Sequence, residues 1–303
     1  MTAIFTFVGV STQQSAIRRI YPRWMTELGV DARLVGVDLP LDAPREQYRR
    51  VVERIADDPD RIGGLVTTHK LNILAASADL FDELDASAAL LHEVSCIAKR
   101  GGRLVGAALD DRTSMLALDR LRPPTEWRGA QLVLLGAGGA STATTLGLHA
   151  AQRAGRGVPS HVHVTARSRD RLDEMAALHE TIGFGIPTTF SVTTSVDQAA
   201  AVVAGSGERS VVVNATGMGK DRPGSPLPDD VRFPPGSLAW DMNYRGERRF
   251  LAQAAAAGAG VVDGWDYFVY SWTKVVSEVH GIGIPPTGPL FDRLSEIARE
   301  EQG

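Results

Sequence analysis

The chain alternates short apolar runs with longer segments in which apolar residues recur at helical spacing. In the first third these runs predict three strands, each followed by a helix or a turn, at residues 3–10, 32–39 and 63–68. A hairpin is predicted at 95–109, turning at Gly101 and Gly102. This order favours an α/β fold whose first sheet is mixed but mainly parallel, because right-handed crossovers join the parallel strands.

A second group of strands follows a helical segment at 110–121, which ends before Pro123 and Pro124. Further strands are expected near residues 131, 161, 187, 210 and 237, and the group closes near 261–264. Two helical stretches complete the tail, at 267–281 and 290–301. We therefore expect one domain from residues 1–113 together with 266–303, and a second domain from residues 114–265.

A glycine cluster connects the strand at 131–135 to the helix-like stretch at 141–155. Such a turn places free backbone N–H groups and the positive end of the helix dipole against a pyrophosphate. Gly136 would make the tight turn, and Gly138 would let the phosphates approach. The cluster therefore predicts a Rossmann-type dinucleotide site, formed by Gly136, Gly138, Gly139, Ala140 and Ser141. The alternative is a glycine turn in another kind of α/β domain.

The end of the next strand indicates which dinucleotide binds. The strand at 161–166 is followed by Arg167, Ser168 and Arg171, with no Asp or Glu at its tip. An NAD site usually has an acid there for the ribose 2′-hydroxyl, whereas guanidinium groups bind a 2′-phosphate. NADP is therefore favoured. The alternative is a solvated basic turn at the start of the helix at 170–183.

Composition agrees with an ordinary cytoplasmic enzyme. A formal net charge of −4 over 303 residues gives no general attraction to nucleic acid or to an anionic membrane. The single cysteine, Cys96, cannot form an internal disulfide, and the seven scattered histidines form no zinc-ligand pattern. No stretch reaches the roughly 20 apolar residues of a membrane helix. We expect a small-molecule substrate, no metal, and a monomer or a homodimer.

Polar residues at the carboxyl ends of the strands are the candidates for chemistry, because open parallel sheets bind ligands there. Lys70 follows the strand at 63–68, and Asp110 follows the hairpin. A lysine and a carboxylate that face a bound nicotinamide can donate and accept the proton that accompanies hydride transfer. The alternatives are a solvated Lys70, and an Asp110 that caps the helix after it.

The order and spacing of these motifs resemble the shikimate dehydrogenase family over nearly the whole chain. GLVTTHK at 64–70 is similar to the family's NVTxPxK, and GAALDD at 106–111 to its GxNTDG. The resemblance implies that Lys70 and Asp110 are the catalytic pair. It also implies a tail of two helices that returns from the NADP-binding domain to the substrate domain.

Further motifs of the family lie in the second half of the chain. GAGGAS at 136–141 resembles its GAGGAA, and ARSRDR at 166–171 resembles the NRTxxR that receives the 2′-phosphate. NATGMG, DMNY and GWDYFVYS resemble NATxxG, D-x-x-Y and G-x-x-M-L-x-x-Q. By this resemblance the cofactor is also bound by Asn214, Thr216 and Gly264, and the substrate by Ser15, Tyr244 and Ser271. Thr67 is a candidate for a new polar contact to the substrate, outside the family's pattern.

The departures from the family fall mainly on substrate contacts. Ser15 keeps one of the two hydroxyls of the family's SxS, and the substrate-binding asparagines fall on Gly64 and Ala108. Lost hydrogen-bonding partners change selectivity by roughly 10⁴ to 10⁵ in strong cases. The resemblance thus implies an NADP-dependent alcohol dehydrogenase (EC 1.1.1.-) of the shikimate or quinate type, related to aromatic amino acid biosynthesis. Its substrate would be a small cyclic polyol or hydroxy acid, without strict specificity for shikimate.

Two other functions stay open at this stage. The chain could be a catalytically silent protein that binds NADP or a metabolite, or an NADP enzyme that acts on a different group such as an imine. If it is a dehydrogenase, Lys70 exchanges the proton in both directions, and we expect desolvation on closure of the cleft to lower its pKa toward neutrality.

Overall fold

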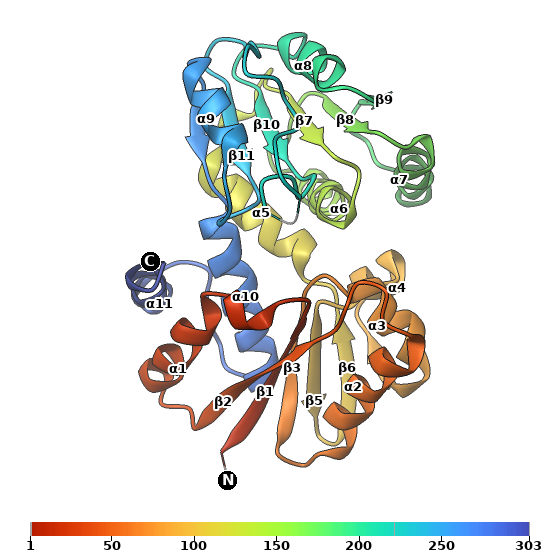
Figure 1. Cartoon of the computed structure of the whole chain (residues 1–303), viewed down its shortest axis with the longest axis vertical. Helices are drawn as coiled ribbons and strands as arrows, with labels where there is room; N and C mark the ends of the chain where they lie inside the picture. The colour runs from red at the N-terminus through yellow and green to blue at the C-terminus, as the bar shows by residue number, and fades with distance from the viewer. Residues whose placement is uncertain (1, 221, 303) are drawn as a thin grey trace. The chain divides into compact units, whose positions relative to one another are not determined.

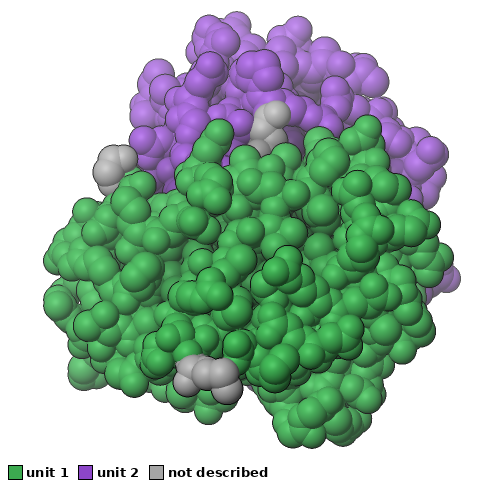
Figure 2. Space-filling view, turned by 60° about the horizontal axis from the view of Figure 1, so that its bottom comes forward, with its two compact units in different colours: residues 1–110, 269–303 green, residues 111–268 purple. Residues whose placement is uncertain are grey.

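A computed structural model of the chain describes residues 2–220 and 222–302. The chain divides into two compact units, which Figure 2 colours separately. Unit 1 comprises residues 1–110 and 269–303, and unit 2 comprises residues 111–268. The domain boundaries that we expect at 113/114 and 265/266 stay a prediction.

Unit 1 contains a six-stranded sheet in the order β2-β1-β3-β5-β6-β4. The strands are β1 (Ala3–Gly9), β2 (Ala32–Asp38), β3 (Arg61–Val66), β4 (Glu83–Leu84), β5 (Cys96–Arg100) and β6 (Arg103–Ala107). Both neighbours of β5 pair with it in antiparallel orientation, and the other pairs are parallel. The expectation of a mixed, mainly parallel sheet is confirmed, and β5 with β6 forms the predicted hairpin.

Helices cover both faces of this sheet (Figure 1). They are α1 (Ile17–Leu28), α2 (Arg45–Asp57), α3 (Lys70–Ser77), α4 (Ala86–Leu91), α10 (Trp265–His280) and α11 (Pro289–Glu300). Alternation along β1 decides which residue faces which layer. Val8 packs with residues of α2 and α3, whereas Phe5 and Phe7 contact Trp272 of α10.

Residues 269–303, which contain most of α10 and all of α11, are part of unit 1, so the tail returns to the first unit as the sequence predicts. Trp24 of α1 is fully buried, and its Nε1–H donates to the carbonyl of Leu294 in α11 at 2.8 Å. Arg23 adds ion pairs to Glu300 and Glu301 beside it. The returning tail therefore completes the layer that covers one face of the sheet.

Unit 2 contains a fully parallel sheet in the order β12-β11-β10-β7-β8-β9. Its strands are β7 (Leu132–Leu135), β8 (Val162–Ala166), β9 (Thr188–Val192), β10 (Val211–Asn214), β11 (Leu238–Asp241) and β12 (Gly260–Val262). Its helices are α5 (Asp110–Leu121), α6 (Gly139–Arg153), α7 (Arg169–Ile182), α8 (Val196–Ala204) and α9 (Arg249–Ala256). This is the Rossmann-type order, and it reverses between β7 and β10, where such sheets bind dinucleotides.

Candidate active site

Lys70 and Asp110 form an ion pair in unit 1. Lys70 is the first residue of α3, which follows β3, and Asp110 is the first residue of α5, which follows β6. Both side chains are largely shielded, with relative exposures of 25% and 12%. The structure thus brings together two groups that lie 40 residues apart in the sequence.

The pKa of Lys70 is raised above its ordinary value. Desolvation by burial acts to lower the pKa, but the carboxylates of Asp110 and Glu93 together outweigh it. Asp110 and Glu93 thus raise the pKa of Lys70 in this structure, and the lowering that we expect on closure of the cleft stays a prediction. Lys70 is an ammonium group at neutral pH and can donate a proton.

Glu93 is the residue that the motif comparison missed. Its side chain is buried, with 6% exposure, and it directly precedes Val94, whose N–H donates to the carbonyl of Lys70 at 3.3 Å. An acid next to two apolar or small residues, Val94 and Ser95, was the available signal in the sequence. Lys70 is consequently exposed to two negative charges in place of one.

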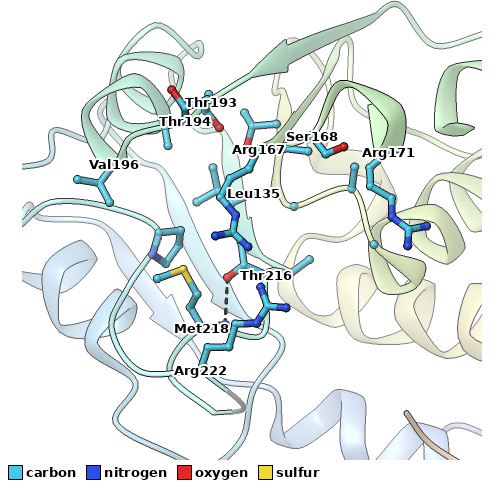
Figure 3. A pocket seen from close by; sticks show the side chains of 18 of the residues that line it. Leu135, Arg167, Ser168, Arg171, Thr193, Thr194, Val196, Thr216, Met218 and Arg222 are labelled. Carbon is cyan, nitrogen blue, oxygen red and sulfur yellow. Dashed lines mark hydrogen bonds between the residues drawn. The ribbon is translucent and has the colours of Figure 1, made fainter. Parts of the chain in front are cut away.

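The expected cofactor loop and the residues around it line a cavity of about 700 Å³ in unit 2. Figure 3 shows Arg167, Thr216 and Arg222 pointing into it, with Thr193, Thr194 and Val196 along one side. Gly136, Gly138, Ser168 and Arg171 also line this cavity. Its volume suits a ligand larger than a simple metabolite.

The glycine turn has the backbone geometry that a phosphate site needs. Gly136 has a φ of 108°, which side chains rarely tolerate, and a Cβ there would lie 3.0 Å from the carbonyl oxygen of Ala215. A Cβ on Gly138 would meet nothing within 4 Å, so this glycine faces open space. The bare backbone at the start of α6 can therefore approach an anion closely.

Several of the expected cofactor residues do not line the cavity but hydrogen-bond to the residues that do. Ser141 donates its hydroxyl hydrogen bond to the carbonyl of Gly136 at 2.6 Å, which fixes the turn. Asn214 is fully buried and accepts a hydrogen bond from the Thr216 hydroxyl at 2.7 Å. Gly139 and Ala140 open α6, and neither they nor Ser141 or Asn214 line the described cavity.

The basic residues at the end of β8 differ in their pairing. Arg171 forms an exposed ion pair with Glu174, at 2.8 Å. Arg167 and Arg222 form no ion pair with any described residue. Arg167 is a predicted site residue, whereas the sequence motifs did not point to Arg222. Arg222 lies in a loop after β10 that has no helical or strand pattern, so only the folded loop brings it to the cavity.

The comparisons place the chain in a family. No family model matches it. A shikimate dehydrogenase (NADP(+)) from Salinibacter ruber is 33% identical over 238 residues, which cover 77% of this chain and 78% of that protein. The chain belongs to the shikimate dehydrogenase family.

Solved structures agree with this family fold over nearly the full length. Quinate dehydrogenase from Corynebacterium glutamicum, in complex with NAD, has a TM-score of 0.78 at 17% identity and covers 99% of both chains. The ligand-free 5-ketofructose reductase of Gluconobacter sp. strain CHM43 has a TM-score of 0.72 at 18% identity, again over 99% of both chains. One fold therefore serves proteins named for different substrates.

The family's substrate residues map to different surroundings in this chain. A Cβ on Gly64, where the family has an asparagine, would lie 1.9 Å from the carbonyl oxygen of Thr6. Strand β1 thus occupies the space that a side chain at position 64 needs. Restoring the family's asparagine there would require the sheet to move.

The candidate substrate residues lie in both units. Ser15 is buried just before α1, Thr67 donates its hydroxyl hydrogen bond to the carbonyl of Val8 at 3.2 Å, and Ser271 lies on α10. Tyr244 belongs to unit 2, where its ring packs against Phe268 with centroids 4.5 Å apart. Within unit 1 the chain itself places Thr67 three residues from Lys70.

The segments at 264–271 and 241–244, which resemble the family's G-x-x-M-L-x-x-Q and D-x-x-Y, lie against each other at Gly264 and Met242. Gly264 is buried, and a Cβ on it would lie 2.2 Å from the carbonyl oxygen of Met242. It is not among the residues that line the described cavity. Asp241 accepts hydrogen bonds from the Asn214 amide and from the N–H of Asn243, and burial raises its pKa to about 6. These contacts fix the loops that follow β10 and β11.

Within residues 2–220 and 222–302, no helix has the length and apolar character that crossing a membrane requires.

Proposed function

We propose that the chain is an NADP-dependent oxidoreductase of the shikimate dehydrogenase type, which interconverts a carbinol and a ketone of a small cyclic polyol or hydroxy acid. The observation that carries the proposal is the shielded Lys70–Asp110 pair, since it supplies a proton at a defined point beside a charged hydrogen-bond partner. The similarity to a shikimate dehydrogenase that uses NADP supports it.

The residues of the 700 Å³ cavity fit a dinucleotide with a 2′-phosphate. The open backbone at Gly138 suits the pyrophosphate, and Arg167 with Ser168 and Arg171 suits the 2′-phosphate. NADPH, when bound, supplies a hydride to the substrate carbon.

Lys70 provides the proton for the reduction. As the hydride reaches the carbonyl carbon, the C=O π electrons move onto oxygen, and the Lys70 ammonium group transfers one proton to that oxygen. The product is the alcohol, and neutral Lys70 recovers its proton from solvent. Asp110 holds the Nζ group in place and accepts a hydrogen bond from a neighbouring substrate hydroxyl. In the oxidation direction the same steps run in reverse.

Two features of unit 1 favour a substrate other than shikimate. Glu93 and Asp110 put two carboxylates beside Lys70, which disfavours a negative substrate group close to them. Position 64 has no room for the family's asparagine. A neutral cyclic polyol or hydroxyketone therefore suits this site better than a carboxylate.

The test is NADPH formation by the purified protein from NADP with shikimate, with quinate, and with cyclic polyols that lack the carboxylate, repeated with NAD. We expect turnover with NADP that is fastest on a substrate without the carboxylate. Binding of NADP without turnover of any substrate would show a silent binding protein and refute the proposal. We propose that the protein is a monomer or a homodimer, and the mass of the same sample measured by light scattering would decide between the two.

A further inference from the structure

We propose that unit 1 carries a binding site for a doubly charged oxyanion, in a groove between α2 and the sheet face formed by β1, β2 and β3. The groove has a volume of about 410 Å³, and three arginines line it: Arg50, Arg54 and Arg61. It shares no residue with the Lys70–Asp110 pair or with the cavity of unit 2.

The groove is built from one face of a helix and the strands below it. Gln47, Arg50 and Arg54 follow the spacing i, i+3, i+7 on α2, so their side chains share a face. Thr6 of β1 and Val37 of β2 contribute a hydroxyl and an apolar wall. Donors therefore surround a partly apolar space.

Arg61, at the start of β3, forms the floor of the groove. It is buried, with 3% exposure, and its Nη1 group donates to the Thr6 hydroxyl at 2.8 Å while its Nε group donates to Asp58 at 3.1 Å. Its Nη2 group has no hydrogen bond to any described residue. A buried guanidinium thus keeps donors that a ligand can use.

Asp58 forms an ion pair with Arg61 at 3.1 Å, and two further cations lie near it. Burial lowers the pKa of Arg61, and the nearby cations Arg54 and Arg33 lower it further, while Asp58 acts in the opposite direction. Arg50 and Arg54 form no ion pair with a described residue. Arg49, on the opposite side of the same helix, pairs with both Glu53 and Asp79. On α2, therefore, Arg49 has carboxylate partners, whereas the guanidinium groups of Arg50 and Arg54 have none among the described residues.

These features select the chemistry of the ligand. A guanidinium fork matches the oxygens of phosphate, and two guanidinium groups without an ion-pair partner among the described residues, those of Arg50 and Arg54, favour a dianion over a monoanion. The ligand is therefore free phosphate or the phosphate of a small monoester, whose carbon part would contact the apolar wall. Nucleic acid is disfavoured by the overall charge of −4.

Calorimetric titration with inorganic phosphate, and separately with phenyl phosphate, tests this site. The titrations are made in an Arg167→Gln, Arg171→Gln, Arg222→Gln background, because those side chains line the other cavity and would bind phosphate too. We expect Arg54→Gln to weaken binding about tenfold, the loss of one charge-assisted hydrogen bond. Arg45→Gln, an exposed arginine of α2 outside the groove, is the matched control and should leave the affinity unchanged.

Tighter binding of phenyl phosphate than of inorganic phosphate would support a monoester, and equal affinity would support free phosphate. No binding of either probe at millimolar concentration would overturn the proposal. Equal affinity in Arg54→Gln and in its parent would overturn it as well. Neither result depends on enzyme activity, so the proposed dehydrogenase function is tested separately.

Discussion

Replacing Lys70 by methionine should destabilise unit 1 in a manner that depends on pH. Methionine is close to lysine in length but carries no charge, so Asp110 loses its ion pair with Lys70 and Glu93 loses a nearby positive charge. Removing one partner of a buried pair costs about 3–5 kcal/mol of unfolding free energy. A carboxyl group can escape this cost by binding a proton.

The cost of that proton sets the upper limit of the effect. For an aspartic acid of ordinary pKa, protonation costs about 4 kcal/mol at pH 7 and about 1.5 kcal/mol at pH 5. The destabilisation by Lys70→Met should therefore fall from about 3–4 kcal/mol at pH 7 to about 1.5 kcal/mol at pH 5. The double variant Lys70→Met, Asp110→Asn has one charge fewer to bury and should recover part of the loss at pH 7.

Urea unfolding followed by far-ultraviolet circular dichroism at the two pH values measures these differences. Both variants should also lose at least about 10²-fold in kcat, because they lack the proton donor, while their affinity for NADP stays that of the wild type. If Lys70→Met is as stable as wild type at pH 7, or is destabilised equally at both pH values, the electrostatic account of the pair is wrong.

Three further predictions concern unit 2. Arg167→Gln should raise the KM for NADP by about tenfold or more and leave that for NAD nearly unchanged, as steady-state kinetics with both cofactors would show; equal effects would contradict a 2′-phosphate contact. Because the pKa of Asp241 is raised to about 6, the protonated form stabilises the fold below about pH 4, and this contribution, about 3 kcal/mol, is lost as pH rises through 6. Asp241→Asn should abolish that loss, and an unchanged pH dependence of unfolding would speak against a buried, ionising Asp241. Gly264→Ala should cost about 1–3 kcal/mol through overlap with the backbone of Met242; Gly283→Ala, where a Cβ meets nothing within 4 Å, is the control in thermal unfolding.

Local patterns predicted most of the secondary structure and the cofactor loop. The apolar run at 131–135 followed by glycines corresponds to β7 and the start of α6, because the strand, the turn and the helix all depend on neighbouring residues. The two-residue strand β4 has no periodic pattern, and only its pairing with β6 defines it. Gly64 likewise gave no sign in the sequence of the close approach of β1.

The sequence by itself determined that the chain is an α/β protein of this family, with a glycine turn for a dinucleotide and with Lys70 and Asp110 at the ends of strands. It could not determine the charge around Lys70, because Glu93 acts through space and not through a motif. It also could not bring Arg61 beneath Arg50 and Arg54, since that grouping arises only where α2 packs on the sheet. Periodicity depends on neighbours along the chain, whereas burial and electrostatic fields depend on residues that only the tertiary structure brings together.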